Sequence, residues 1–243
     1  DVYKRQGMWL AVKLIHKKTL TQIVTGRRSF DYSRVIYSMW IGLLLSTLLL
    51  VLNYVFLGSE IEFRGPNPWE YATFTLFAIV LTPYQAGFEE ALFRGYLIQG
   101  VSLILDNKVI LAVGTSFVFT APHLLNPEPY EYGFAPYVTS MLIAGMFFAF
   151  ITLLDGGIEL AVGVHAVNNL WIGLIANTDV TVMPTPSLFV TQLERYVFFP
   201  DIFSEIVVYL ILLAVLGWKY RWFKSRRLFG DKDGSSSVQC LES

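Results

Sequence analysis

The sequence predicts an all-α fold, a polytopic membrane helix bundle with about six spanning helices. The first observation is composition, because the mean hydropathy is +0.52 and only 15% of the residues are charged, whereas soluble domains carry about 25%. The second is that apolar stretches of roughly 20 residues, long enough to cross a bilayer as a helix, recur along the chain. Both observations place the chain in the membrane class.

The first predicted span is Val35–Leu57, which is mostly aliphatic. The second apolar stretch, Trp69–Ile104, is too long for one upright span, because a helix rises about 1.5 Å per residue. Pro83 is the natural site of a break or kink. We therefore expect one apolar piece that ends near Thr82 and a second from about Tyr84 to Ile104.

Four further spans follow, and turn-rich or polar segments separate them. These separating segments are Asn126-Pro-Glu-Pro129, Asp155-Gly-Gly157 and a polar loop at Asn177–Asp201. The predicted spans are Val109–Leu125, Tyr137–Leu154, Ile158–Ala176 and Phe203–Tyr220.

The expected organisation is a cytoplasmic N-terminal segment (1–34), the bundle with its site (35–220) and a basic, then Ser/Gly-rich cytoplasmic tail (221–243). Lys and Arg concentrate in the two end segments, so both termini are predicted to be cytoplasmic. The apolar stretch Met8–Ile15 is a candidate for the end of a further span upstream. No basic block interleaved with aromatics indicates a nucleic-acid partner, and the one cysteine, Cys240, excludes an internal disulfide.

Five ionisable residues lie in stretches that otherwise have the composition of lipid-buried helix. A charge at bilayer depth is costly, so such groups are functional candidates. They form a carboxylate pair, a cation and two imidazoles, and an amide, Asn169, follows one helical turn after the second imidazole. This grouping points to a hydrolytic site. The five residues are Glu89, Glu90, Arg94, His123 and His165.

Helix spacing divides these residues into pairs. Glu90 and Arg94 lie four residues apart on one helix face, and we interpret them as a structural ion pair. Glu89 points about 100° away from Glu90 and is available for another role. His123 shares a face with Phe119, which we interpret as a wall of the pocket.

Depth can be compared by counting from the polar turns. Glu89 and His123 each lie 17 residues from Asp106, so their side chains are expected at matching height in a helical hairpin. His165 follows Asp155 by 10 residues, which gives a shallower position. The count therefore favours Glu89 beside His123 over either of them beside His165.

These residue types suffice for amide hydrolysis without a Ser or Cys nucleophile. A carboxylate and a neutral imidazole in a dry site can remove a proton from water. A second His and an Asn can donate hydrogen bonds to a developing oxyanion. The only cysteine lies in the tail.

Three motifs, in order on successive hydrophobic helices, resemble those of the CAAX-protease and bacteriocin-processing family. They are Glu89-Glu90-x-x-x-Arg94, Phe119-x-x-x-His123 and His165-x-x-x-Asn169. The family comprises intramembrane glutamic endopeptidases related to the type II CAAX prenyl endopeptidase. The resemblance implies that Glu89 and His123 activate water. It further implies that His165 and Asn169 stabilise the oxyanion, that Glu90 and Arg94 support the site, and that no metal or other cofactor is required.

The resemblance thus implies an intramembrane endopeptidase in a bacterial cell membrane, in contact with lipid and acting on a peptide or protein of unknown identity. Its oligomeric state is not indicated. A zinc-dependent protease would also use Glu and His, as zinc ligands, although no His-Glu-x-x-His helix is present. A third class is non-enzymatic, because an immunity or scaffold protein, or a proton-coupled transporter, would also use buried Glu and His.

Overall fold

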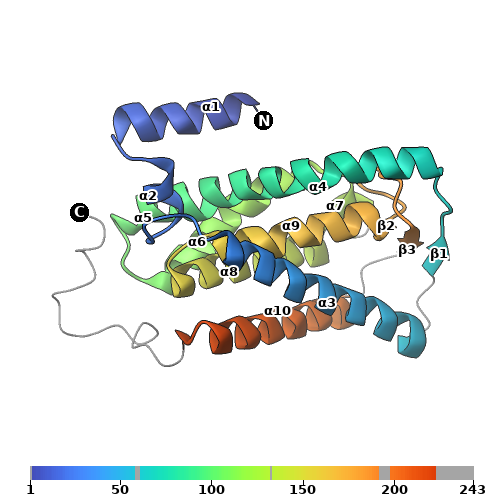
Figure 1. The fold of residues 1–243 in the computed structure, drawn as a ribbon. Coiled ribbons are helices and arrows are strands. Elements are labelled where there is room, and N and C mark those ends of the chain that lie inside the picture. Colours follow the sequence, from blue (N-terminus) through green and yellow to red (C-terminus); the bar gives the residue numbers. More distant parts are fainter. Residues whose placement is uncertain (1, 58–60, 132, 192–197, 223–243) are drawn as a thin grey trace.

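The computed structural model describes residues 2–57, 61–131, 133–191 and 198–222, and Figure 1 shows them as a bundle of long helices. This confirms the predicted all-α membrane bundle. The long helices are α3 (Tyr32–Leu57), α4 (Pro68–Glu90), α8 (Phe134–Asp155), α9 (Glu159–Leu174) and α10 (Phe198–Lys219).

Shorter helices complete the bundle. The α-helices are α1 (Val2–Leu10), α2 (Leu20–Val24), α5 (Ile98–Ser102), α6 (Lys108–Thr120) and α7 (Glu128–Glu131). Two π-helical turns and one 3₁₀ turn join them, namely η1 (Ala11–Ile15), η2 (Ala91–Leu97) and η3 (Ala121–Leu125).

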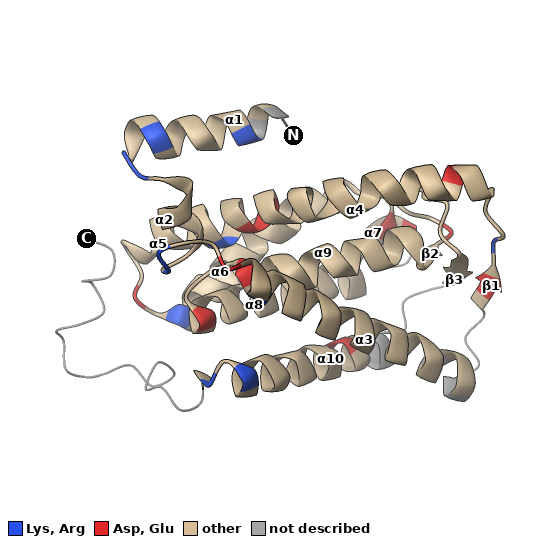
Figure 2. Ribbon diagram, in the orientation of Figure 1, with Lys and Arg blue, Asp and Glu red and all other residues tan. Residues whose placement is uncertain are grey.

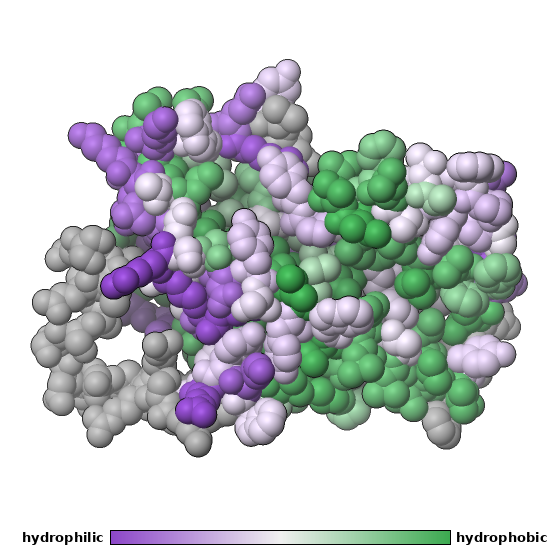
Figure 3. All heavy atoms as spheres, in the orientation of Figure 1, coloured by the Kyte–Doolittle hydropathy of each residue, from purple (hydrophilic) through white to green (hydrophobic). Residues whose placement is uncertain are grey.

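Among the described residues, four helical stretches are long and apolar enough to cross a membrane. The other two predicted spans correspond to α4 and α9. Helix α9 has only 16 residues and is enclosed by α3, α4 and α8. Figure 3 shows hydrophobic side chains over much of the visible bundle surface, whereas hydrophilic ones gather near the N-terminal segment. The four stretches are Tyr32–Leu52, Lys108–Leu125, Phe134–Asp155 and Ile202–Lys219.

The ends of several helices follow from local side-chain chemistry. Asn67 Oδ1 accepts a hydrogen bond from the Trp69 backbone N–H at 2.9 Å and caps α4. Asn107 caps α6 in the same way, through the Val109 backbone N–H at 2.9 Å. Gly156 adopts a left-handed conformation, with φ of 73°, and ends α8. The last feature confirms the turn predicted at Asp155-Gly-Gly157.

The expected break at Pro83 is wrong, because α4 continues through Pro83 to Glu90. Proline removes one backbone N–H, but membrane helices tolerate this loss without ending. The departure from α-helical geometry comes later, in η2, and α5 follows it directly. The second apolar stretch is therefore nearly continuous as helix from Pro68 to Ser102.

Helix α9 is the central helix, and every residue from Glu159 to Val167 is buried. Glycines let α3 approach it closely. A Cβ atom on Gly163 would overlap Ser38 Oγ and the Val35 carbonyl, and one on Gly42 would lie 2.6 Å from Val167 Cγ1. Small residues at such crossings are typical of membrane helix pairs. The crossing of α3 and α9 thus depends on the absence of side chains at two positions.

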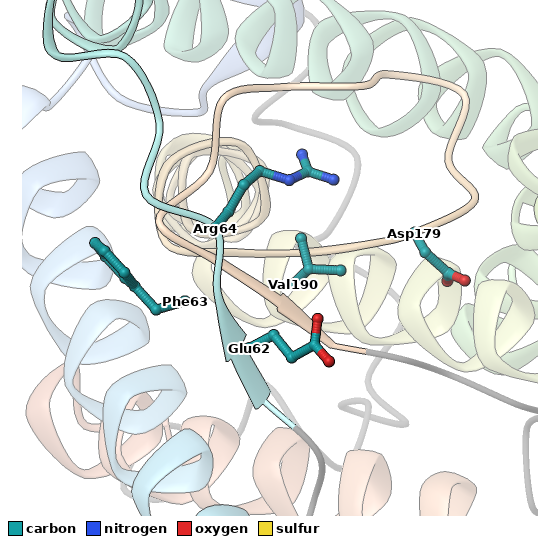
Figure 4. Close-up of a pocket in the computed structure, with 5 residues that line it drawn as sticks. All are labelled: Glu62, Phe63, Arg64, Asp179 and Val190. Atoms are coloured by element: carbon teal, nitrogen blue, oxygen red, sulfur yellow. The ribbon is translucent and has the colours of Figure 1, made fainter.

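A small sheet, which the sequence analysis missed, lies at the end of the bundle opposite α2 (Figure 1). Its strands are β1 (Ile61–Phe63), β2 (Ala176–Thr178) and β3 (Phe189–Thr191), in the order β1-β3-β2. β3 pairs antiparallel with β1 and parallel with β2. Beside the sheet is a hollow of about 420 Å³, shown in Figure 4 with its lining residues Glu62, Phe63, Arg64, Asp179 and Val190. None of the predicted site residues lines it.

The N-terminal segment packs on the outside of the bundle. The stretch Met8–Ile15 is helical, in α1 and η1, and Met8 packs against a buried cluster that contains Ala91 and Val162. Figure 2 shows Lys and Arg gathered mainly at this end of the bundle. The cytoplasmic location of both termini stays a prediction. Most of the predicted tail, residues 223–243 with Cys240, lies outside the described residues.

Candidate active site

The glutamate motif lies where α4 changes into the π-helical turn η2. Glu89 and Glu90 are the last two residues of α4, and Arg94 lies within η2. Arg94 Nη1 donates to Glu90 Oε1 at 3.1 Å, which confirms the predicted ion pair. The exposed fractions are 0% for Glu90 and 3% for Arg94. Isolated π-helical turns are frequent at functional sites.

The Arg94 guanidinium is enclosed by protein on several sides. Its Nη2 donates to the Gly145 carbonyl of α8 at 3.2 Å. Its carbon lies 4.2 Å from the ring centre of Phe119 and 5.2 Å from that of Phe148. Aromatic faces attract cations, so rings as well as Glu90 compensate the buried charge.

His165 on α9 contacts both glutamates. Its Nδ1 lies 2.7 Å from Glu90 Oε1, and its Nε2 lies 3.7 Å from Glu89 Oε2. An ionised carboxylate only accepts hydrogen bonds, so His165 Nδ1 is the donor to Glu90. The Nε2 side of the ring then faces Glu89. The ring is also stacked on Phe148, with 5.2 Å between ring centres.

This position of His165 differs from the depth obtained by counting. The count compared two turns as though both lay at the surface. Asp106 is exposed, but Asp155 is only 4% exposed and forms ion pairs with Arg27 and Arg34. The turn after α8 therefore begins inside the protein, and counting from it underestimates the depth of His165.

His123 lies in η3, immediately after α6, and is half-buried. Its Nδ1 is 2.9 Å from the Phe119 carbonyl oxygen, which can only accept, so Nδ1 carries the proton. Nε2 is then the basic nitrogen when the ring is neutral. Within the described residues, no hydrogen bond joins His123 to Glu89.

Phe119 links the two imidazoles. Its ring centre lies 4.8 Å from that of His123 and 6.3 Å from that of His165. Asn169 is half-buried, one helical turn beyond His165 on α9. The Phe119–His123 and His165–Asn169 motifs therefore meet at the Phe119 ring. His165 in turn contacts both residues of the glutamate pair.

Comparison with known proteins agrees with this arrangement. Residues 68–171 match the family described as type II CAAX prenyl endopeptidase Rce1-like. For this segment, the match confirms the predicted family resemblance. The match begins at the first residue of α4 and extends into α9, so the Rce1-like segment contains every predicted site residue.

One relative of known sequence extends the similarity beyond that segment. Over 222 residues, the chain is 25% identical to the uncharacterized protein YyaK of Bacillus subtilis (strain 168). The aligned part covers 91% of this chain and 73% of YyaK. No solved structure matches the chain. At the level of the family, the match of residues 68–171 supports a CAAX-type intramembrane protease.

The sequence analysis missed two side chains of the candidate site. Phe148 reaches His165 and Arg94 from α8, a helix that carries none of the three motifs. Gln85 Nε2 donates to Glu89 Oε1 at 3.1 Å. Its spacing of four residues from Glu89 was a signal available in the sequence. Phe148 had no comparable signal, because only packing brings α8 to the site.

A second group of charges, two buried carboxylates and two partly buried arginines, holds the start of α9. Arg27 Nη2 lies 2.7 Å from Asp155 Oδ2, and Arg27 Nη1 lies 3.0 Å from Glu159 Oε2. Arg34 Nη1 bonds the other Asp155 oxygen at 2.5 Å. Buried charges need such partners. The group joins the N-terminal segment to α8 and α9, and it therefore fixes the end of α9 that leads to His165.

The described part of the chain contains no group of three or more His, Cys, Asp or Glu that could hold a metal ion.

Proposed function

We propose that the protein is a metal-independent intramembrane endopeptidase in which Glu89 and His123 activate a water molecule. The observation that supports this most directly is the contact of His165 with both glutamates, inside a segment that belongs to a family of intramembrane proteases. Carboxylates and imidazoles brought together in a buried site are typical of general acid–base catalysis.

In the first step, water attacks the carbonyl carbon of the scissile peptide. Its proton passes to the Glu89 carboxylate, assisted by His123, whose Nδ1 is held by the Phe119 carbonyl. The Nε2 atom of His123 is therefore the ring nitrogen that is free of a proton in the neutral ring and can act as a base. The carbonyl oxygen becomes an oxyanion.

The oxyanion accepts hydrogen bonds from His165 and Asn169. Glu90 orients the His165 ring through Nδ1, so that Nε2 points towards Glu89. When the ring carries both protons, Nε2 donates a hydrogen bond to the oxyanion. The intermediate then collapses, the C–N bond breaks, and the proton held near Glu89 passes to the leaving nitrogen. Donors fixed in a site that excludes water stabilise the developing charge more strongly than water does.

The remaining residues of the site hold it in place. Arg94 compensates the charge of Glu90, and Phe119 separates the two imidazoles. We further propose a peptide or protein substrate, a bacterial cell membrane as the location, and a cytoplasmic position for both termini. The basic N-terminal segment supports this orientation.

The test is cleavage of a fluorogenic peptide library by the purified protein in liposomes. Glu89→Ala is expected to lower the rate at least 100-fold, because general-base catalysis contributes about 10²–10⁴-fold. Glu70→Ala is the matched control, since Glu70 lies exposed in the first turn of the same helix. Equal cleavage by wild type and Glu89→Ala would exclude the proposed role of Glu89. Loss of cleavage with a chelator would favour a zinc-dependent protease instead.

A further inference from the structure

Gln85 belongs to none of the three motifs, yet its side chain forms a hydrogen bond with the carboxylate of Glu89. It lies half-buried on α4, one helical turn before Glu89. Its side-chain amide donates to Glu89 Oε1 at 3.1 Å. We infer that Gln85 is a positioning residue, which holds Oε1 so that Oε2 is the oxygen that acts on water. This inference rests on the proposed function.

The two oxygens of Glu89 have different surroundings. Oε1 accepts the Gln85 amide, whereas Oε2 faces His165 Nε2 at 3.7 Å. That second distance exceeds a direct hydrogen bond, so His165 does not fix Oε2 in the way that Gln85 fixes Oε1. The amide therefore selects which oxygen is directed to the site, and it restricts rotation of the carboxylate about its last bond.

The two adjacent glutamates also have different partners. Glu90 accepts from a cation, Arg94, and from His165, so its charge is compensated. Glu89 accepts from Gln85, a neutral amide that orients the carboxylate without cancelling its charge. A general base must be able to take a proton. Different environments assign different roles to paired carboxylates, and here the assignment is Glu90 for support and Glu89 for chemistry.

A second glutamine offers a matched comparison for Gln85. Gln99, on α5, is half-buried and donates to the Ile23 carbonyl at 2.7 Å. It is the same residue type with the same kind of bond, but its acceptor is a backbone carbonyl away from the site. A purely structural role for Gln85 predicts that both glutamines respond alike to substitution.

The experiment compares steady-state cleavage by Gln85→Met, Gln85→Glu and Gln99→Met. Gln85→Met keeps the side-chain length and removes the donor. We expect its kcat to fall roughly 10- to 100-fold, as is typical when a reacting group is misplaced, with KM unchanged within about 2-fold. Gln99→Met is expected to retain the wild-type kcat.

Gln85→Glu gives a conditional rescue. At acidic pH its protonated carboxyl group can donate to Glu89 and restore the wild-type arrangement. As the pH rises, two carboxylates face each other one turn apart, and activity is expected to fall below that of Gln85→Met. A structural role gives no such crossing of the two pH profiles.

Two experimental outcomes distinguish failure of this inference from failure of the proposed function. Wild-type kcat in Gln85→Met, together with an inactive Glu89→Ala, would overturn the positioning role and leave the protease. Full activity in Glu89→Ala would overturn both. A third measurement is independent of turnover: the infrared carboxylate band of Glu89, isolated by subtracting Glu89→Gln, is expected to shift in Gln85→Met. An unshifted band would refute the inference even if no substrate is found.

Discussion

The substitution Glu90→Gln tests how the buried charges hold the site together. The side chains of Glu90 and Arg94 are 0% and 1% exposed, so solvent does not screen the pair. Glutamine keeps the shape and can still accept from His165, but it leaves the Arg94 charge uncompensated. Removing one member of a buried pair costs about 3–5 kcal/mol. That range corresponds to a change of more than 100-fold in the unfolding equilibrium.

The assay is unfolding of the purified protein in mixed micelles with increasing SDS, followed by tryptophan fluorescence. Glu70→Gln, on the exposed first turn of the same helix, is the control and is expected to change stability by less than about 0.5 kcal/mol. The double variant Glu90→Gln/Arg94→Met removes the orphaned charge, so it is expected to recover part of the loss. A loss below about 1 kcal/mol in Glu90→Gln would show that the pair does not stabilise the fold.

Two further substitutions test the packing around α9. Gly163→Ala places a Cβ against Ser38 Oγ and is expected to destabilise the bundle by about 1–3 kcal/mol in the same assay. Gly114→Ala is the control, because it makes the same change within a helix with no atom within 4 Å of the added Cβ, and it is not expected to destabilise the bundle. Equal midpoints for the two variants would contradict the close crossing. Phe148→Leu removes the ring stacked on His165, and we expect kcat to fall roughly 3- to 10-fold, from about 0.5–1.5 kcal/mol of ring contact. An unchanged kcat would show that this ring does not orient His165.

Local spacing explains what was predicted correctly about the site. Glu90 and Arg94 are four residues apart, and their ion pair forms within one continuous stretch of helix. His123 bonds the Phe119 carbonyl, four residues before it, for the same reason. Contacts of this kind depend on helix geometry alone. The order of the motifs was then sufficient to indicate the family, although the catalytic role of each residue stays a prediction.

Three other features could not be predicted from local spacing: the depth of one turn, the course of the helix at Pro83, and the sheet. Counting from Asp155 underestimated the depth of His165, because Asp155 is buried in ion pairs with Arg27 and Arg34 and that turn does not lie at the surface. Pro83 is a helix breaker in water, yet it lies within α4. The three-stranded sheet joins segments more than a hundred residues apart, and its strands have only three residues each. Strands this short carry no periodic pattern to detect.

The sequence by itself determined the membrane class, the order of the helices and the residue types of the site, because hydrophobicity and i,i+4 spacing are local properties. Only the tertiary structure decided that His165 contacts both glutamates, that Phe148 stacks on it, and that Arg27 pairs with the buried Glu159 at the start of α9. Each of these contacts joins different segments of the chain, from consecutive helices for Phe148 and His165 to segments 132 residues apart for Arg27 and Glu159. Their formation depends on close packing at the glycines of α3 and α9 and on ion pairs that compensate one another inside the protein.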